Sequence, residues 1–233
     1  MKKFWNFRNE VPLAPDQGRA LILEGVISEE SWWDDEITPK MFRDELNSGT
    51  GPIAVYINSP GGDCVAASQI YTMLTEYPGR VTVKIDGTAA SAASVVAMAG
   101  DEVLMSLTAM MMIHNPMTGA WGNTDDMKQA IEMLDEVKES IINAYERKTG
   151  LSRAKISHLM DAETWMNAKK AVELGFADGF IGECDHAADA IAFETKTTQA
   201  QLMQKAVALA KEKPKHIGRS VDERLKKLNS LKY

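Results

Sequence analysis

Three short apolar runs, separated by stretches with helical character, constrain the fold of this chain more than any other feature. The runs at residues 19–27, 51–58 and 80–86 predict strands, and the second is rich in β-branched and aromatic side chains. The intervals between them predict helices over 38–46 and 64–77. Strands that alternate with helices usually pair in parallel, so we expect an α/β fold.

The same alternation continues after the third run. An apolar segment at 91–99 predicts a buried helix, and apolar runs at 101–106 and 109–114 predict two further strands. A long helix is predicted over 125–148, with Thr124 as its cap. The remaining elements are predicted at 152–160 (helix), 168–175 (helix) and 176–183 (strand and turn).

Charge is distributed unevenly along the chain. The net charge is −7, but residues 195–233 hold ten Lys and Arg against three Asp and Glu, which leaves −14 on the rest. We therefore divide the chain into an N-terminal segment (1–18), an α/β domain (19–194) and a basic helical tail (195–233). The acidic domain argues against nucleic acid as a partner.

The sequence also argues against several kinds of site. No apolar run is long enough to cross a membrane, and the first residues lack the apolar core of a secretory signal. The two cysteines, Cys64 and Cys184, lie far apart and form no metal-ligand cluster. We expect a cytoplasmic protein without a metal site or a cofactor.

Four small groups of residues could carry chemistry. Ser91 follows a strand and opens a helix, where free backbone N–H groups could hold an oxyanion. Gly62, after a strand and a proline, could bring another N–H close to a ligand. His114 stands at the end of a strand, so it could share with Ser91 the carboxyl edge of a parallel sheet. Asp161 or Glu163 could orient that histidine.

Each group also has a more ordinary explanation. Ser91 could simply cap a buried helix, and the residues around Gly62 could form a plain turn. His114 could be structural, and Asp161 or Thr164 could cap the next helix. Taken singly, the ordinary explanation is the better one for each of them.

Taken together, four motifs carry a resemblance to a known family. They are YINSPGG at 56–62, DGTAAS at 86–91, MIHNP at 112–116 and WMNAKKAVELGFAD at 165–178. In this order and spacing they resemble the Clp protease proteolytic subunit family of serine peptidases, over about residues 19–182. The resemblance implies a spiral of β-β-α units, shared with the crotonase enzymes, with a long handle helix over 125–148.

The resemblance also implies roles for individual residues. Ser91 matches the nucleophile and His114 the general base. The backbone N–H groups of Gly62 and Ala92 match the oxyanion donors, although Ala92 replaces a methionine common in the family. Glu163 falls where the family usually has aspartate, so Asp161 is the reserve candidate for the acid. We expect Gly61, Gly62 and Asn115 to contact the substrate.

The partners expected from the resemblance are polypeptides. It implies a homo-oligomer in the form of a heptameric ring, and two such rings could stack. A separate ATPase unfoldase is a further possible partner. The region 24–46 resembles phage and prophage members of the family, which are associated with capsid maturation. The primary hypothesis is therefore an endopeptidase that cleaves capsid or scaffold protein.

Three alternatives remain open. The first is the catalytic subunit of an ATP-dependent Clp-type protease. The second is a crotonase-type acyl-CoA enzyme, which needs backbone oxyanion donors but no pair of serine and histidine. The third is a ring-forming scaffold subunit with a degenerate site, which the glutamate at 163 keeps open.

Overall fold

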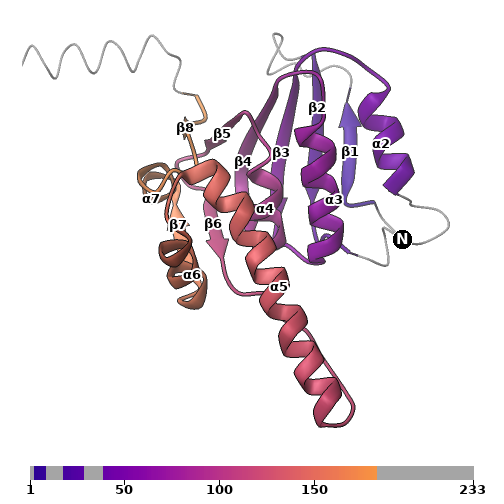
Figure 1. The fold of residues 1–233 in the computed structure, drawn as a ribbon. Helices are drawn as coiled ribbons and strands as arrows, with labels where there is room; N and C mark the ends of the chain where they lie inside the picture. Colours follow the sequence, from indigo (N-terminus) through magenta and orange to yellow (C-terminus); the bar gives the residue numbers. More distant parts are fainter. Residues whose placement is uncertain (1–2, 9–17, 29–38, 183–233) are drawn as a thin grey trace, which may run out of the picture. The chain divides into compact units, whose positions relative to one another are not determined.

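In the computed structural model, which describes residues 3–8, 18–28 and 39–182, the strands follow the order β1-β2-β3-β4-β5-β8 (Figure 1). From β2 to β8 along this path, each strand pairs in parallel with the next. Their bounds are β2 (Arg19–Glu24), β3 (Ile53–Ser59), β4 (Val81–Ala90), β5 (Glu102–Met105) and β8 (Gly179–Phe180). The predicted α/β class is confirmed, whereas the predicted tail (195–233) lies outside the described residues.

Strand β1 (Trp5–Arg8) is an element that the sequence pattern did not predict. It pairs antiparallel with β2, with Trp5 opposite Leu23. The Trp5 ring packs edge-on against Phe42 of helix α2 (Pro39–Asn47), with 5.4 Å between the ring centroids. Both side chains are almost fully buried, and burial of a large apolar side chain contributes roughly 2 kcal/mol. This part of the N-terminal segment therefore joins the hydrophobic core.

Helices cover one face of the sheet. Figure 1 shows α3 (Cys64–Thr75), α4 (Ala92–Ala97) and the C-terminal part of α5 (Thr124–Thr149) in front of the strands. All six residues of α4 are buried, as predicted for a helix that is apolar on nearly every side. The short helix α4 therefore lies inside the core, and packing on all sides holds its first residue, Ala92, in place.

Strand β4 is the branch point of the sheet. Its first half pairs with β5, from Thr82 opposite Glu102 onwards, and its second half pairs with β6 (Met110–Ile113), ending with Ala90 opposite Met112. The prediction that this strand ends at residue 86 was wrong. The strand continues through Gly87 because β6 supplies its hydrogen-bond partners. This pairing cannot be predicted from the residues near Gly87.

The region after residue 161 also differs from expectation. Helix α6 (Arg153–Asp161) is followed by strand β7 (Thr164–Asn167), which pairs antiparallel with β6. Thr164 therefore belongs to a strand and does not cap a helix. Helix α7 (Ala168–Glu173) begins after Asn167, whose side chain accepts the Lys170 N–H at 2.9 Å.

Helix α5 has well-defined ends. Asn123 is its cap, one residue before the predicted Thr124, because the Asn123 side chain accepts backbone N–H groups while the Asp126 side chain accepts the Asn123 N–H. The helix ends as predicted at Gly150, which has a left-handed backbone with φ of 67°.

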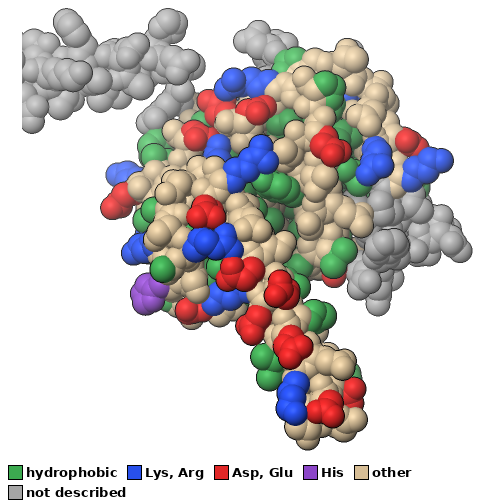
Figure 2. Space-filling model, viewed as in Figure 1, with side chains coloured by type: hydrophobic (Ala, Val, Ile, Leu, Met, Phe, Trp, Pro, Cys, Tyr) green, Lys and Arg blue, Asp and Glu red, His purple; other side chains and the backbone are tan. Residues whose placement is uncertain are grey.

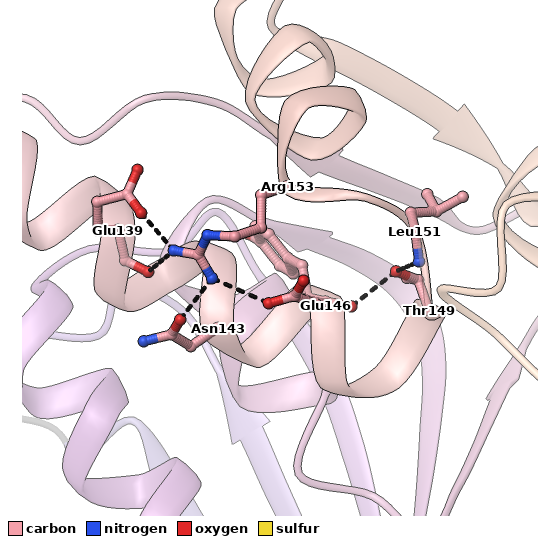
Figure 3. A network of polar contacts seen from close by, with 7 residues as sticks. Glu139, Asn143, Glu146, Thr149, Leu151 and Arg153 are labelled. Carbon is pink, nitrogen blue, oxygen red and sulfur yellow. Dashed lines mark hydrogen bonds and ion pairs between the residues drawn. The ribbon is translucent and has the colours of Figure 1, made fainter.

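A cluster of polar contacts ties the C-terminal part of α5 to α6. The Arg153 guanidinium lies between Glu139 and Glu146 and also contacts Asn143 (Figure 3). The two carboxylates raise the pKa of the Arg153 guanidinium, chiefly through these hydrogen bonds.

The N-terminal part of α5 projects away from the sheet (Figure 1). The buried residues of α5 all lie in its C-terminal part, whereas Ile131 and Met133 are exposed, as is Trp121 just before the helix. Figure 2 shows hydrophobic side chains beside acidic ones along this projection. Although α5 is long, neither it nor any other helix of the described ranges is apolar enough over sufficient length to cross a membrane.

We predict that Asn123→Ala loosens the first turn of α5. Loss of an asparagine cap costs about 1 kcal/mol, which corresponds to roughly five-fold faster hydrogen exchange of the first-turn amides. Hydrogen exchange of the Met127 amide checks this, with Thr124→Ala as the matched control. An equal effect of both variants would contradict the assignment of Asn123 as the cap.

Candidate active site

Ser91 occupies the junction between β4 and α4 in a strained backbone conformation. Its φ is 53° and its ψ is −128°, values that cost a non-glycine residue on the order of 1–3 kcal/mol. The conformation is held from one side by β6, since the Ser91 N–H donates to the Met112 carbonyl at 2.9 Å. From the other side, the Ser94 N–H donates to the Ser91 carbonyl, also at 2.9 Å.

His114 lies directly beside Ser91. It is the first residue after β6, and β6 pairs in parallel with the half of β4 that leads into Ser91. The expected shared carboxyl edge of the sheet is therefore present. His114 Nε2 lies 2.7 Å from Ser91 Oγ. When Nδ1 carries the ring proton, Nε2 can accept the hydroxyl proton of Ser91.

The Gly61–Gly62 segment packs against the serine from a third direction. A side chain on Gly61 would place its Cβ 2.7 Å from the Ser91 Cβ and 2.9 Å from the Ala92 nitrogen. A Cβ on Gly62 would lie 1.8 Å from the Ile27 carbonyl oxygen. Both positions also have positive φ, so lack of space and backbone conformation each require glycine there.

Two backbone donors remain free beside Ser91. Ile27 holds the glycine segment by donating to the Gly61 carbonyl at 2.9 Å and accepting the Asp63 N–H at 2.7 Å. Among the described residues, the N–H groups of Gly62 and Ala92 have no acceptor. A site with two unpaired amides near a hydroxyl can stabilise negative charge on a carbonyl oxygen.

The two candidate acids are not hydrogen-bonded to His114. Asp161 Oδ1 accepts Lys138 Nζ at 2.6 Å and Asn115 Nδ2 at 3.0 Å. These bonds, with that from Lys138 the stronger, hold the pKa of the Asp161 carboxyl below its usual value. Glu163 accepts the Trp165 indole N–H at 3.3 Å. No carboxylate of the described residues hydrogen-bonds the His114 ring.

Of the predicted site residues, the structure thus groups Ser91, His114, Ala92 and the two glycines, and their roles stay predictions. Asn115 follows His114 but turns its amide toward Asp161, and its Oδ1 is buried without a partner among the described residues. Sequence reasoning missed Ile27 and Lys138. Nothing local marks either one, because Ile27 acts through its backbone and Lys138 resembles any other charged residue on a helix.

A cavity of about 520 Å³ opens next to these groups, between α3, α4 and α5. Ala92 and Val95 form one wall, and Cys64 and Ile141 form others. Burial, and to a lesser degree Asp63, raises the pKa of the Cys64 thiol, so this thiol stays protonated and is a poor nucleophile. The Cys64 thiol in the cavity wall is therefore not a competing nucleophile.

Comparison with known proteins identifies related sequences. A family model described as Clp protease matches residues 17–183. The ATP-dependent Clp protease proteolytic subunit 1 of Chlamydia muridarum is 33% identical over 150 residues, covering 63% of this chain and 78% of that protein. Subunit 2 of Treponema denticola is 30% identical over 159 residues, covering 67% and 78%. The proteolytic subunit of Bacteroides fragilis is 32% identical over 140 residues, covering 59% and 67%.

We predict that Glu163→Gln slows turnover more than Asp161→Asn. Asp161 is engaged by Lys138, whereas among the described residues the Glu163 carboxylate is held only by the exposed Trp165 indole and is freer to turn to His114. Neutralising an acid that contacts the histidine costs about 10⁴-fold, so for a carboxylate that must first rotate we expect a loss on the order of 10-fold. Steady-state kinetics on a fluorogenic peptide measure it. A larger loss for Asp161→Asn would make Asp161 the acid.

Proposed function

Because this chain belongs to the Clp protease family, we propose that it is a serine endopeptidase that hydrolyses peptide bonds through an acyl-enzyme. The observation that carries the proposal is the 2.7 Å contact between Ser91 Oγ and His114 Nε2. The free amides of Gly62 and Ala92 beside that contact support it. A hydroxyl, a base and two oxyanion donors are the minimum set for acyl transfer.

The acylation step uses each of these groups once. Ser91 Oγ attacks the scissile carbonyl carbon while its proton moves to His114 Nε2. The carbonyl oxygen becomes an oxyanion and accepts hydrogen bonds from the Gly62 and Ala92 N–H groups. The C–N bond then breaks as His114 returns the proton to the leaving amine, and the acyl group stays on Ser91.

Deacylation repeats the sequence with water. His114 takes a proton from a water molecule, whose oxygen attacks the ester carbon. The same two amides hold the second oxyanion, and the C–Oγ bond breaks as His114 returns the proton to Ser91. The carboxylic acid leaves, and the enzyme is restored without any cofactor.

The substrate is proposed to bind in extended form beside the Gly61–Gly62 segment. Glycine at both positions lets a peptide backbone come close, and a strand added there would use main-chain hydrogen bonds. Gly61, Gly62 and Asn115 would contact the peptide. The 520 Å³ cavity adjoining Ala92 would take one of its apolar side chains.

The proposed assembly is a ring homo-oligomer. The resemblance to the family further suggests that the ring is a heptamer and that two rings stack. The projecting part of α5 supports an oligomer, because Ile131 and Met133 are exposed there in the described part of the chain. Exposed apolar residues grouped on one projection are typical of interaction surfaces. An enclosed chamber would admit only flexible segments of polypeptide.

Two settings for the peptidase are proposed, and they differ in partner. The resemblance of region 24–46 to phage and prophage members supports cleavage of capsid or scaffold protein, although residues 29–38 lie outside the described residues. The relatives from Chlamydia, Treponema and Bacteroides are named as subunits of ATP-dependent Clp proteases. Their names support an ATPase unfoldase as the partner at least as well.

We predict that Ser91→Ala abolishes both peptide turnover and labelling by a fluorophosphonate probe. Loss of the nucleophile from a serine–histidine site lowers kcat by about 10⁶-fold. The matched control is Ser106→Ala, which removes a hydroxyl that contacts Thr108 in the turn after β5. Turnover that persists in Ser91→Ala would refute the peptidase. Turnover absent in the unaltered chain, with no labelling, would favour a scaffold or a crotonase-type enzyme.

We predict a discrete oligomer that Ile131→Glu dissociates, since a charge on the projecting part of α5 would have to be buried in the interface. Light scattering measures the mass, and Lys128→Gln on the same part of the helix is the control. A monomer at micromolar concentration would contradict the ring. Two additions to the assembled peptidase then separate the two settings. Cleavage of an added capsid protein without an ATPase would support the capsid setting, and cleavage of a folded protein only when a Clp ATPase is added would support the ATP-dependent one.

A further inference from the structure

The peptide group between Ser91 and Ala92 is held by a hydrogen-bond relay that starts on α5. Ser94 Oγ lies 2.6 Å from the Ser91 carbonyl oxygen and 2.8 Å from the Tyr145 hydroxyl. Ser94 is fully buried and Tyr145 is 1% exposed, so no bulk water competes for these bonds.

The direction of the relay follows from proton counting. The Ser91 carbonyl can only accept, so the single hydroxyl proton of Ser94 is donated to it. In the contact between Ser94 and Tyr145, the Tyr145 O–H must therefore be the donor. The chain runs from the Tyr145 hydroxyl, through the Ser94 hydroxyl, to the Ser91 carbonyl.

The Tyr145 hydroxyl is well suited to begin such a chain. Its ring packs edge-on against Phe176, with 5.4 Å between the centroids, which fixes its position. Burial raises the pKa of the hydroxyl well above its ordinary value, while the bond to Ser94 lowers it by less. Tyr145 thus keeps its proton and remains a donor.

The carbonyl that receives the relay belongs to the same planar unit as the Ala92 N–H. In a trans peptide, the C=O and N–H bonds point in opposite directions, so the orientation of one sets that of the other. The backbone of α4 also holds this carbonyl, because the Ser94 N–H donates to it at 2.9 Å, so the relay adds a second donor to the same oxygen. Donors to the carbonyl also polarise the peptide, which strengthens the N–H as a donor.

We propose that Tyr145 and Ser94 are positioning residues that aim and polarise the Ala92 N–H toward the oxyanion. The inference rests on the proposed peptidase function and adds two residues to it. Neither side chain touches the substrate, because both act through the Ser91 carbonyl. Their contribution is largest when the carbonyl oxygen of the substrate carries full negative charge, which is in the tetrahedral intermediate and the transition states beside it.

The test compares Ser94→Ala, Tyr145→Phe and the double variant. Removing one oxyanion donor costs about 10²–10³-fold, so misdirecting it should cost less: roughly 10-fold in kcat for Ser94→Ala and about 3-fold for Tyr145→Phe, with KM unchanged. The double variant should be no slower than Ser94→Ala, since Tyr145 acts only through Ser94. The affinity for a peptide boronic acid, which forms a tetrahedral adduct with Ser91, should fall by the same factors.

Rates are expressed per active site by titration with a fluorophosphonate, so a loss of folded protein does not count as a loss of kcat. Tyr77→Phe is the matched control, because it removes another buried tyrosine hydroxyl, bonded to the Gly51 carbonyl at 2.9 Å. A Ser94→Ala variant within two-fold of the unaltered kcat, losses equal to those of Tyr77→Phe, or additive losses in the double variant would each overturn the relay. Activity that survives Ser91→Ala would instead overturn the peptidase itself.

Discussion

The parallel pairing of β4 with β6 is the interaction on which the candidate site depends. The register that sets Ala90 opposite Met112 lets the Ser91 N–H reach the Met112 carbonyl, and it brings His114 beside the serine hydroxyl. A slip of one residue along β6 would turn its side chains to the opposite face of the sheet. The buried residues of β6, Met111 and Ile113, resist such a slip because it would expose them.

The glycine segment adds a second constraint, which combines close approach with backbone pairing to Ile27. A side chain at Gly61 would collide with Ser91 and one at Gly62 with Ile27, which follows β2, so glycine lets these segments approach one another closely. The strain at Ser91, on the order of 1–3 kcal/mol, is offset by bonds to its N–H and its carbonyl. Strain of this kind persists only where the surroundings over-determine the backbone, and here β6, α4 and the glycine segment all contribute.

The sequence predicted those parts of the molecule whose cause is local. The alternating strands and helices, Gly150 as the end of α5 and the buried helix after Ser91 follow from periodicity, turn residues and apolar content. The continuation of β4 past Gly87 and the strand at Thr164–Asn167 depend on β6, a partner far along the chain, so no window of residues shows them. The order of the four sequence motifs suggested the roles of Ser91 and His114. Their proximity follows from the register between β4 and β6.

The acid was the least predictable part of the site, and the fold explains why. Ser91 and the amides of Gly62 and Ala92 are positioned by the backbone, whereas Asp161, the last residue of α6, and Glu163, in the turn before β7, are exposed. Their reach depends on side-chain rotation and on competitors such as Lys138, which holds Asp161 in a partly exposed ion pair at 2.6 Å. The register that sets Thr164 opposite Ile113 places this turn beside the end of β6, but neither carboxylate is hydrogen-bonded to the His114 ring. The strands and glycines therefore position the serine, the histidine and the two amides, whereas both candidate carboxylates are exposed side chains at the junction of α6 and β7.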